Sequence, residues 1–415
     1  MVQAKLRSPV SDLSHAGLGD GVVSEHADEF AEWLHQQGYK PSTVADLLRS
    51  LAAWTDWMRG VGFAGTDLRM GFDMYKQQLA RRAESRPRSA IGQWLLRAPS
   101  KFIYFLEEQG IIEKNQPVSS PTTRSPILDE FRIWTLQHRG LAESTLDIYE
   151  GVLIDVVETI GNIPTEYTPE KLRDVVLQRA RPYGVARART IVTAVRVFLR
   201  FLGATGRCPP GMEYAIPGFA SWRLSSVPKY LRPADVEQLI GSCANSKTGI
   251  RDKAVLLLLA RLGLRASEVA HLKFADIDWV NGKIIVCGKG RHQDWLPLPQ
   301  EIGDAILLYL QEARPTLPAA EVFTTVVAPL RPLSRLAVTC IVRSALQRTG
   351  IKAPINGAHV LRHSAAVAML QEGMSLAGIG AVLRHRSPDT TAHYAKVDLC
   401  LLAEIAQPWP EGPSC

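Results

Sequence analysis

Cysteine is scarce in this sequence and widely spaced along it. The six cysteines form no CxxC motif and no Cys/His pair at the spacing that a zinc site needs; they are Cys208, Cys243, Cys287, Cys340, Cys400 and Cys415. The sequence therefore predicts no metal site and no other cofactor. A reducing cytoplasm is the expected location.

Long hydrophobic runs are also missing. The longest run, Ala254–Ala260, is far shorter than the roughly 20 apolar residues that span a bilayer. The N-terminal residues MVQAKLRSPVSDLSHAGLGD contain no apolar core of the kind that a secretory signal peptide has. We therefore expect no membrane partner.

Acidic residues are fewer than basic ones. The chain has 48 Lys and Arg against 41 Asp and Glu, for a net charge of +7 and an isoelectric point near 9.1. This surplus suits a polyanionic partner, although many basic proteins never bind nucleic acid. With 46% hydrophobic and 21% charged residues, the 415-residue chain should fold into two or three globular domains.

Two segments rich in Pro, Ser or Gly are candidate domain boundaries. They are residues 115–126 (NQPVSSPTTRSP) and 208–228. We therefore expect three domains, at residues 1–117, 126–208 and 228–415.

The first two domains look like diverged copies of one another. Residues 29–58 (EFAEWLHQQGYKPSTVADLLRSLAAWTDWM) match residues 130–160 (EFRIWTLQHRGLAESTLDIYEGVLIDVVETI), and residues 100–110 match residues 195–206. The matched aromatic residues are Phe30 with Phe131, Trp33 with Trp134, Phe102 with Phe198, and Phe105 with Phe201. Each copy should be a small helical domain whose first helix ends at Gly and whose second begins at a Ser or Thr N-cap.

The aromatic residues of the copies are interpreted as core packing, not as a surface on which bases stack. Basic residues on the outside of the second copy are better candidates for phosphate contacts, although solvated helix faces often look the same. The predicted DNA-binding residues are Arg187, Arg189 and Arg196, with Arg179 and Arg181 nearby.

The third domain should be mostly helical with one small sheet. Pro233 suits the first turn of a helix, and residues 250–272 (IRDKAVLLLLARLGLRASEVAHL) are expected to be a helix. Residues 276–282 (DIDWVNG) should form a turn, and residues 283–299 (KIIVCGKGRHQDWLPLP) a β-hairpin with a Gly-Lys-Gly turn. The predicted fold class is therefore mainly α, multidomain, with a mixed α+β third domain.

Two Arg-containing motifs of this domain could carry chemistry. Glu268 lies three residues after Arg265, close enough around a helix to hold its guanidinium. His359 and Arg362 lie on one face of a helix and can point at one ligand, near an N-terminus that also favours anions. An ordinary surface ion pair and a capping His beside a surface Arg remain the alternatives.

Two further places add single polar groups. Lys289 lies between Gly288 and Gly290 in the hairpin turn, where a generic exposed lysine is also common. The segment LRHRSPDTTAHYAKVD contains His385 and, nine residues later, Tyr394. Neither place indicates a function by itself.

Together, these residues resemble the catalytic set of the tyrosine recombinase, or phage integrase, family. The set consists, in family order, of Arg265, Lys289, His359, Arg362, His385 and Tyr394, with Glu268 in support. The resemblance covers residues 231–398, and the second helical copy resembles the family's core-binding domain. Two positions depart from the pattern: Arg384 replaces the usual Gly, and Asp294 with Trp295 replaces a basic residue near the end of the hairpin.

The resemblance implies two SAM-like helical domains before the catalytic domain, and a site-specific recombinase that cleaves and rejoins DNA through a 3′-phosphotyrosyl intermediate. Tyr394 would be the nucleophile, with Arg265, Arg362 and His385 on the phosphate. His359, the nearest candidate base, would accept the tyrosine proton, and Lys289 would protonate the 5′-oxygen. No ATP is needed.

Several alternatives stay open at this stage. A type IB topoisomerase uses a similar residue set, and an inactive DNA-binding accessory protein should have lost at least one member of it. Among recombinases, the additional N-terminal copy favours a mobile-element integrase or transposase over an Xer-type enzyme that resolves chromosome dimers. The expected partners are double-stranded DNA and other recombinase subunits in a tetramer, with residues 398–410 packing on a neighbour or within their own subunit.

Overall fold

The computed structural model describes residues 22–63, 67–84, 91–113, 125–220, 227–288 and 293–397, together with Leu402. The chain divides into two compact units. One comprises Met1–Lys114 and Ser226–Cys415, and the other comprises Asn115–Ser225. None of the described helices is long and apolar enough to cross a membrane.

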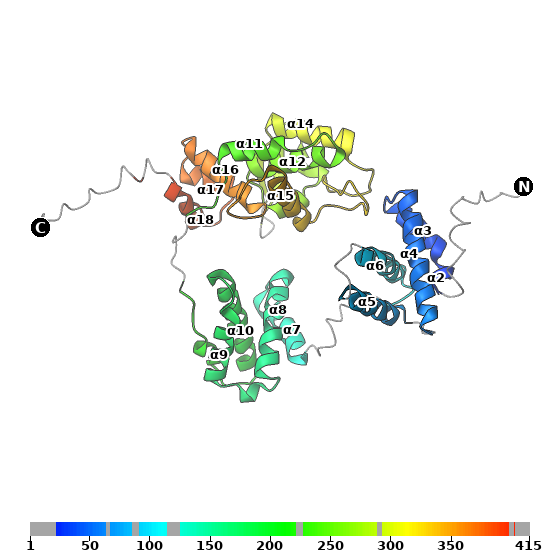
Figure 1. The fold of residues 1–415 in the computed structure, drawn as a ribbon. Coiled ribbons are helices and arrows are strands. Elements are labelled where there is room, and N and C mark those ends of the chain that lie inside the picture. The colour runs from blue at the N-terminus through cyan, green and yellow to red at the C-terminus, as the bar shows by residue number, and fades with distance from the viewer. Residues whose placement is uncertain are drawn as a thin grey trace, which may run out of the picture. The chain divides into compact units, whose positions relative to one another are not determined.

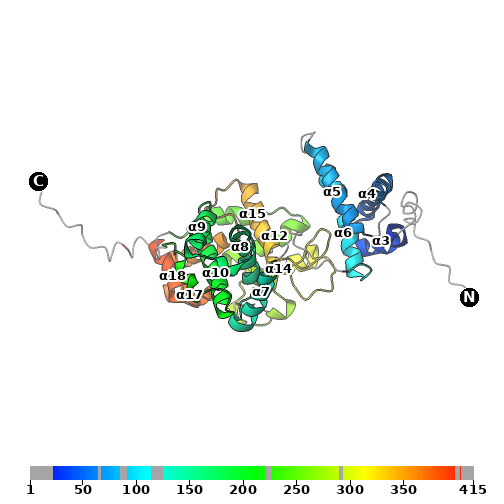
Figure 2. The ribbon, with the colours of Figure 1, turned by 90° about the horizontal axis from the view of Figure 1, so that it is seen from below.

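The N-terminal part is a small helical bundle with a core of its own. Its helices lie side by side in both views (Figures 1 and 2); they are α2 (Val22–Glu25), α3 (Ala27–Gln36), α4 (Pro41–Gly60), α5 (Leu68–Glu84) and α6 (Ile91–Glu108). The largest fully buried side chain of this core, Trp54, lies on α4.

The second unit is another helical bundle. Its main helices are α7 (Pro126–Arg139), α8 (Glu143–Ile160), α9 (Pro169–Ala180) and α10 (Val185–Ala204), with short 3-10 turns at Pro164–Glu166 and Met212–Ala215. Helix α10 contributes more buried side chains to the apolar core than any other helix of this unit.

The two bundles repeat the same aromatic packing, as the matched sequence positions predict. The Phe30 and Phe102 rings meet edge-on with centroids 5.2 Å apart, and the corresponding Phe131 and Phe198 rings meet edge-on at 5.5 Å, both at 84°. A second aromatic pair is repeated as well. The ring centroids of Trp33 and Phe105 lie 5.8 Å apart and those of Trp134 and Phe201 lie 5.7 Å apart, with an interplanar angle of 55° in both pairs. The four phenylalanine residues that pair edge-on are fully buried, so the interpretation as core packing is confirmed.

The predicted starts of the second helices are wrong by two residues. Helix α4 begins at Pro41 with Lys40 as N-cap, and α8 begins at Glu143 with Ala142 as N-cap. Neither N-cap makes a side-chain hydrogen bond. A proline fits the first turn without an N–H donor, so α4 starts at Pro41 and the Ser-Thr pair falls inside the helix.

The part that follows the second unit combines helices with one small sheet. Its helices up to the sheet are α11 (Pro233–Gly241), α12 (Lys247–Arg261) and α13 (Ala266–Ala270). Those after the sheet are α14 (Gln300–Leu308), a π-turn at Tyr309–Ala313, α15 (Arg335–Thr349), α16 (His359–Gln371), α17 (Leu376–Val382) and α18 (Pro388–Ala392), ending in a 3-10 turn at His393–Val397. Helix α12 is buried along most of its length and is the centre of the core.

The sheet is antiparallel with the order β1 (Ile277–Asp278), β2 (Lys283–Cys287) and β3 (Gln293–Pro297). The predicted hairpin is confirmed, with Ile285 opposite Trp295. Strand β1 lies within the segment predicted to be a turn, because two residues are too few to show an alternating pattern.

The single helix predicted over residues 250–272 is wrong in one respect. Helix α12 ends at Arg261, and Gly263 adopts φ +59° before α13 begins at Ala266. Left-handed backbone of this kind ends a helix and is favourable for glycine. The break places Arg265 at the N-cap of a new helix, where its side chain leaves the apolar core.

Candidate active site

Arg265 and Glu268 are joined at the start of α13. Glu268 accepts hydrogen bonds from the Arg265 backbone N–H and from its Nη1, both at 2.7 Å, and its side chain is only 2% exposed. The buried carboxylate therefore fixes the backbone and the guanidinium of the same residue. About a third of the Arg265 side chain remains exposed, which leaves other donors of its guanidinium available to a ligand.

Arg362 approaches Arg265 from the first turn of α16. It is 2% exposed, and its guanidinium donates to two backbone carbonyls, that of Gly263 at 2.5 Å and that of Leu383. Burial and the nearby Arg265 lower the pKa of Arg362 to about 10, so the group is still charged at neutral pH. The two backbone carbonyls therefore hold the guanidinium of Arg362 in place, as the carboxylate of Glu268 holds that of Arg265.

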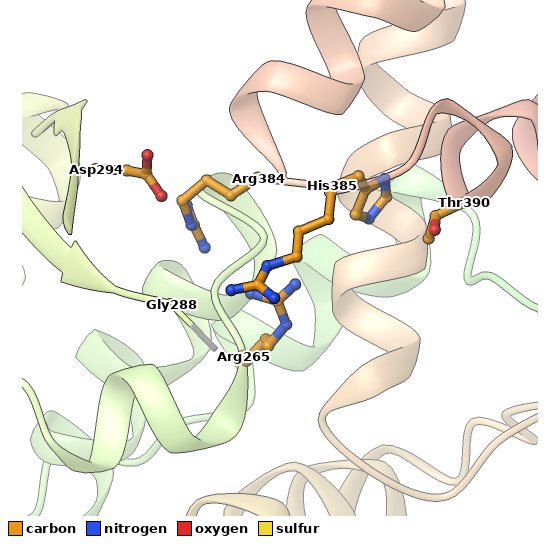
Figure 3. A pocket seen from close by; sticks show the side chains of 7 residues that line it. Arg265, Gly288, Asp294, Arg384, His385 and Thr390 are labelled. Atoms are coloured by element: carbon orange, nitrogen blue, oxygen red, sulfur yellow. The ribbon is translucent and has the colours of Figure 1, made fainter. Parts of the chain in front are cut away.

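Two cavities of about 400 Å³ share Arg265 as a wall. One is also lined by His359 and Arg362, and the other by His385, Arg384 and Asp294. Figure 3 shows the second cavity, with Asp294 on the β3 side and His385 on the segment after α17. Four of the predicted catalytic residues therefore line one pair of cavities that meet at Arg265.

His385 is oriented by the helix that immediately precedes the candidate nucleophile. Its Nδ1 lies 2.8 Å from the hydroxyl of Thr391 in α18, and its ring stacks on that of Tyr394 at 6.3 Å and 6°. Burial, followed by the charges of Arg362 and Arg265, lowers the pKa of His385 to about 4. The ring is therefore neutral at neutral pH.

Tyr394 lies behind these residues, in the 3-10 turn His393–Val397. It is 2% exposed and is not among the residues that line the two cavities. Its hydroxyl lies 2.8 Å from Nδ1 of His363. Burial raises the pKa of Tyr394, while the charge of Arg362 acts in the opposite direction.

His363 is a residue of this site that the sequence interpretation missed. The hydrogen bond recorded on the tyrosine hydroxyl is with His363, whereas the His359 ring packs edge-on against His363 at 4.5 Å. Burial and the neighbouring His359 lower the pKa of His363 to about 4. A signal was present, because His363 follows His359 by four residues and so shares its face of α16.

Four predicted residues remain. Lys289 falls outside the described residues, whereas Gly288, which precedes it in the hairpin turn, lines the cavity with His385. Arg187 and Arg189 are exposed on α10, whereas Arg196 donates to the carbonyl of Ile216 at 2.8 Å and is half-buried.

The fold and this arrangement define a catalytic domain of the tyrosine-recombinase type, preceded by helical domains. Residues 229–399 match the family model described as "Phage integrase family". The "Putative integrase/recombinase y4rA" of Sinorhizobium fredii is 35% identical over 96% of this chain and 98% of its own length. The tyrosine recombinase XerD of Listeria innocua is 30% identical over 67% of this chain and 96% of its own.

A crystal structure of the XerH site-specific recombinase resembles this chain with a TM-score of 0.56 and 19% identity, covering 67% of this chain and 83% of XerH. This similarity bears on the fold alone. The similarity to y4rA along almost the whole chain, and to XerD over two thirds of it, shows that this chain belongs to the phage integrase family of tyrosine-type site-specific recombinases.

The lowered histidine pKa values predict a loss of stability in acid. The unfolded chain binds protons on His363 and His385 near pH 6.5, but the folded chain does so only near pH 4. Between these values the unfolded state binds more protons, so the free energy of unfolding falls as the pH decreases from about 6.5 to 4. Urea unfolding of the full chain at several pH values measures this slope.

His363→Asn should make that slope shallower by about one proton, because one of the two groups is gone. The same substitution at exposed His35 is the matched control and should leave the slope unchanged. A His363→Asn slope equal to the wild-type slope would contradict the assignment of His363 as a half-buried neutral base.

Proposed function

We propose that this recombinase cleaves and rejoins double-stranded DNA through covalent attachment of the strand to Tyr394. The observation that carries the proposal is the pair of cavities that meet at Arg265, with Arg362 and His385 on their walls and the Tyr394 ring stacked behind His385. Similar crystal structures include the lambda integrase bound to DNA and the XerH recombinase bound to its difH substrate. DNA is therefore the substrate proposed here.

Positive charge at this site suits the phosphoryl group. A phosphodiester carries one negative charge and disperses more as the phosphorus becomes five-coordinate. The guanidinium groups of Arg265 and Arg362 can each donate two hydrogen bonds to non-bridging oxygens, and His385 can add another donor. Because their places are fixed by Glu268 and by backbone carbonyls, little reorganisation is needed when charge develops.

The proton of Tyr394 must leave as the phosphorus–oxygen bond forms. His363 is in hydrogen-bond contact with the hydroxyl and is neutral, so it can accept this proton directly. His359, which packs on His363, remains in the proposed catalytic set as a phosphate donor or as the next group in the proton path. Attack also requires the 3-10 turn at His393–Val397 to bring the buried hydroxyl to the phosphate.

The helical copies before the catalytic domain are proposed to hold the DNA. Arg187 and Arg189 are exposed on α10 and can contact phosphates. Arg196 donates to the carbonyl of Ile216 and would contribute to DNA binding through that bond. A tetramer on two DNA sites is proposed as the active assembly.

A role in a mobile element is proposed over resolution of chromosome dimers. The similarity to y4rA extends over 96% of this chain, including the additional N-terminal copy, whereas that to XerD covers 67%. The N-terminal copy is therefore shared with a protein named as a putative integrase/recombinase, whereas about a third of this chain lies outside the similarity to XerD.

The mobile-element proposal predicts boundaries in the flanking DNA. Sequencing around the gene should show inverted repeats at both ends of a segment and an interrupted target sequence outside them. A single copy beside the replication terminus, with an uninterrupted flank in related genomes, would instead favour the Xer-type role.

Lys289 is proposed as the acid that protonates the leaving 5′-oxygen. The Lys289→Ala substitution should strongly slow the cleavage of ordinary DNA. The variant should still cleave a substrate with sulfur at the 5′-bridging position at close to the wild-type rate, because a leaving thiolate needs little protonation. Single-turnover cleavage of the two substrates measures the effect. If sulfur gives no rescue, another group supplies the proton.

Tyr394→Phe should abolish the covalent protein–DNA adduct, because phenylalanine has no hydroxyl to attack phosphorus. Binding of duplex DNA should stay within about threefold of wild type, since the buried ring still packs. Denaturing gels with a nicked substrate detect the adduct. Tyr214→Phe, at a tyrosine that is 83% exposed, is the control and should form adduct normally. Normal adduct yield from Tyr394→Phe would overturn the nucleophile assignment.

A further inference from the structure

Arg384, which immediately precedes His385, has an unusual backbone conformation. Among the residues that the structure describes, it is the single non-glycine residue with positive φ, at +54°. Glycine adopts this conformation without steric cost, and a long side chain does not. The site therefore keeps an arginine where the backbone favours glycine.

The Arg384 side chain is buried in the catalytic site. It is 5% exposed, and its Nη2 donates to Oε2 of Glu268 at 2.7 Å. Its Nη1 donates to the carbonyl of Val382 at 3.2 Å, and its buried Nε has no hydrogen-bond partner. Burial lowers the pKa of Arg384, while Glu268 and, more weakly, Asp294 act in the opposite direction.

One carboxylate therefore serves two arginines. Glu268 accepts from the backbone and Nη1 of Arg265 and from Nη2 of Arg384, all at 2.7 Å. If Arg265 alone paired with Glu268, the negative charge would cancel much of its positive charge. With Arg384 sharing the carboxylate, the three groups together carry a net charge of +1, from two arginines and one glutamate.

We propose that Arg384 is a positioning residue for this recombinase, which shares Glu268 with Arg265 and so leaves the Arg265 guanidinium both oriented and positively charged for the scissile phosphate. The proposal rests on the proposed function of Arg265 as a phosphate ligand. Arg384 itself acts through Glu268, to which its Nη2 is bonded.

The effect on cleavage follows from the charge of the phosphate. Without Arg384, Glu268 would draw Arg265 toward itself and reduce the stabilisation of the developing negative charge. The loss should therefore be largest for an anionic phosphodiester and small for a neutral methylphosphonate at the same position. A general loss of folding or DNA binding would not depend on this charge.

The test compares Arg384→Gln, Arg384→Gly and Arg384→Lys in the full chain. On a phosphodiester substrate, Arg384→Gln and Arg384→Gly should lower the single-turnover cleavage rate about 10- to 100-fold, with Arg384→Lys intermediate. On methylphosphonate DNA, the ratio of wild-type to Arg384→Gln rate should shrink to within about threefold. Arg384→Gly also relieves the backbone, so its melting temperature controls for folding.

Arg261→Gln is the matched control. Arg261 pairs with Glu237 and Glu301 in the same domain, away from the cavities, and its loss removes the same charge. Its cleavage rate should stay within about twofold of wild type. Arg384 variants that cleave normally, or that are equally slow on both substrates, would overturn the proposal for Arg384. If Arg265→Gln itself cleaves phosphodiester DNA normally, the failure lies in the proposed role of Arg265.

Discussion

The site depends on holding several guanidinium groups together in a poorly solvated place. Arg265, Arg362 and Arg384 each disfavour the charge of the others, and burial adds to this cost. Two kinds of acceptor offset the repulsion: the carboxylate of Glu268, and the backbone carbonyls of Gly263, Leu383 and Val382. Burial, together with this positive charge, lowers the pKa of His363 and His385 to about 4 and keeps both rings neutral at neutral pH. The site proposed to bind a phosphate therefore also holds a neutral base beside Tyr394.

The break between α12 and α13 is what allows this arrangement. A Cβ at Gly263 would lie 2.5 Å from Cδ2 of Leu383, and the φ of +59° would strain any other residue. Gly263 thus lets the chain turn close to the residue before Arg384 and presents its carbonyl to Arg362. The close approach of the two segments, far apart in sequence, sets the distance between Arg265 and His385 across the shared cavities.

Much of this could be predicted from the sequence, and for a physical reason in each case. The repeated aromatic residues predicted two similar cores, because large rings at matched positions of a helical bundle can be buried in one way only. The hairpin followed from β-branched residues and glycine. The break between α12 and α13 and the contact of His363 could not be predicted. They depend on contacts between distant segments, namely that of the Gly263 carbonyl with Arg362 and that of the Tyr394 hydroxyl with His363. Arg384 was noted as a departure from the family pattern, but its partner Glu268 is 116 residues away.

The structure also separates the residues proposed to bind the phosphate from the residue proposed to attack it. Arg265 borders both cavities, and its partners on either side come from α16 and from the segment after α17. Tyr394 belongs to neither cavity, and its hydroxyl is held by His363. Arg265 and Arg362 are thus fixed by contacts within the domain core, whereas Tyr394, the proposed nucleophile, lies on the 3-10 turn at His393–Val397. In the proposed reaction, an anion bound at Arg265 and Arg362 would disfavour the negatively charged form of Tyr394, so proton transfer to His363 would have to accompany attack. The proposed nucleophile would therefore stay unreactive until the phosphate and the turn at His393–Val397 come together.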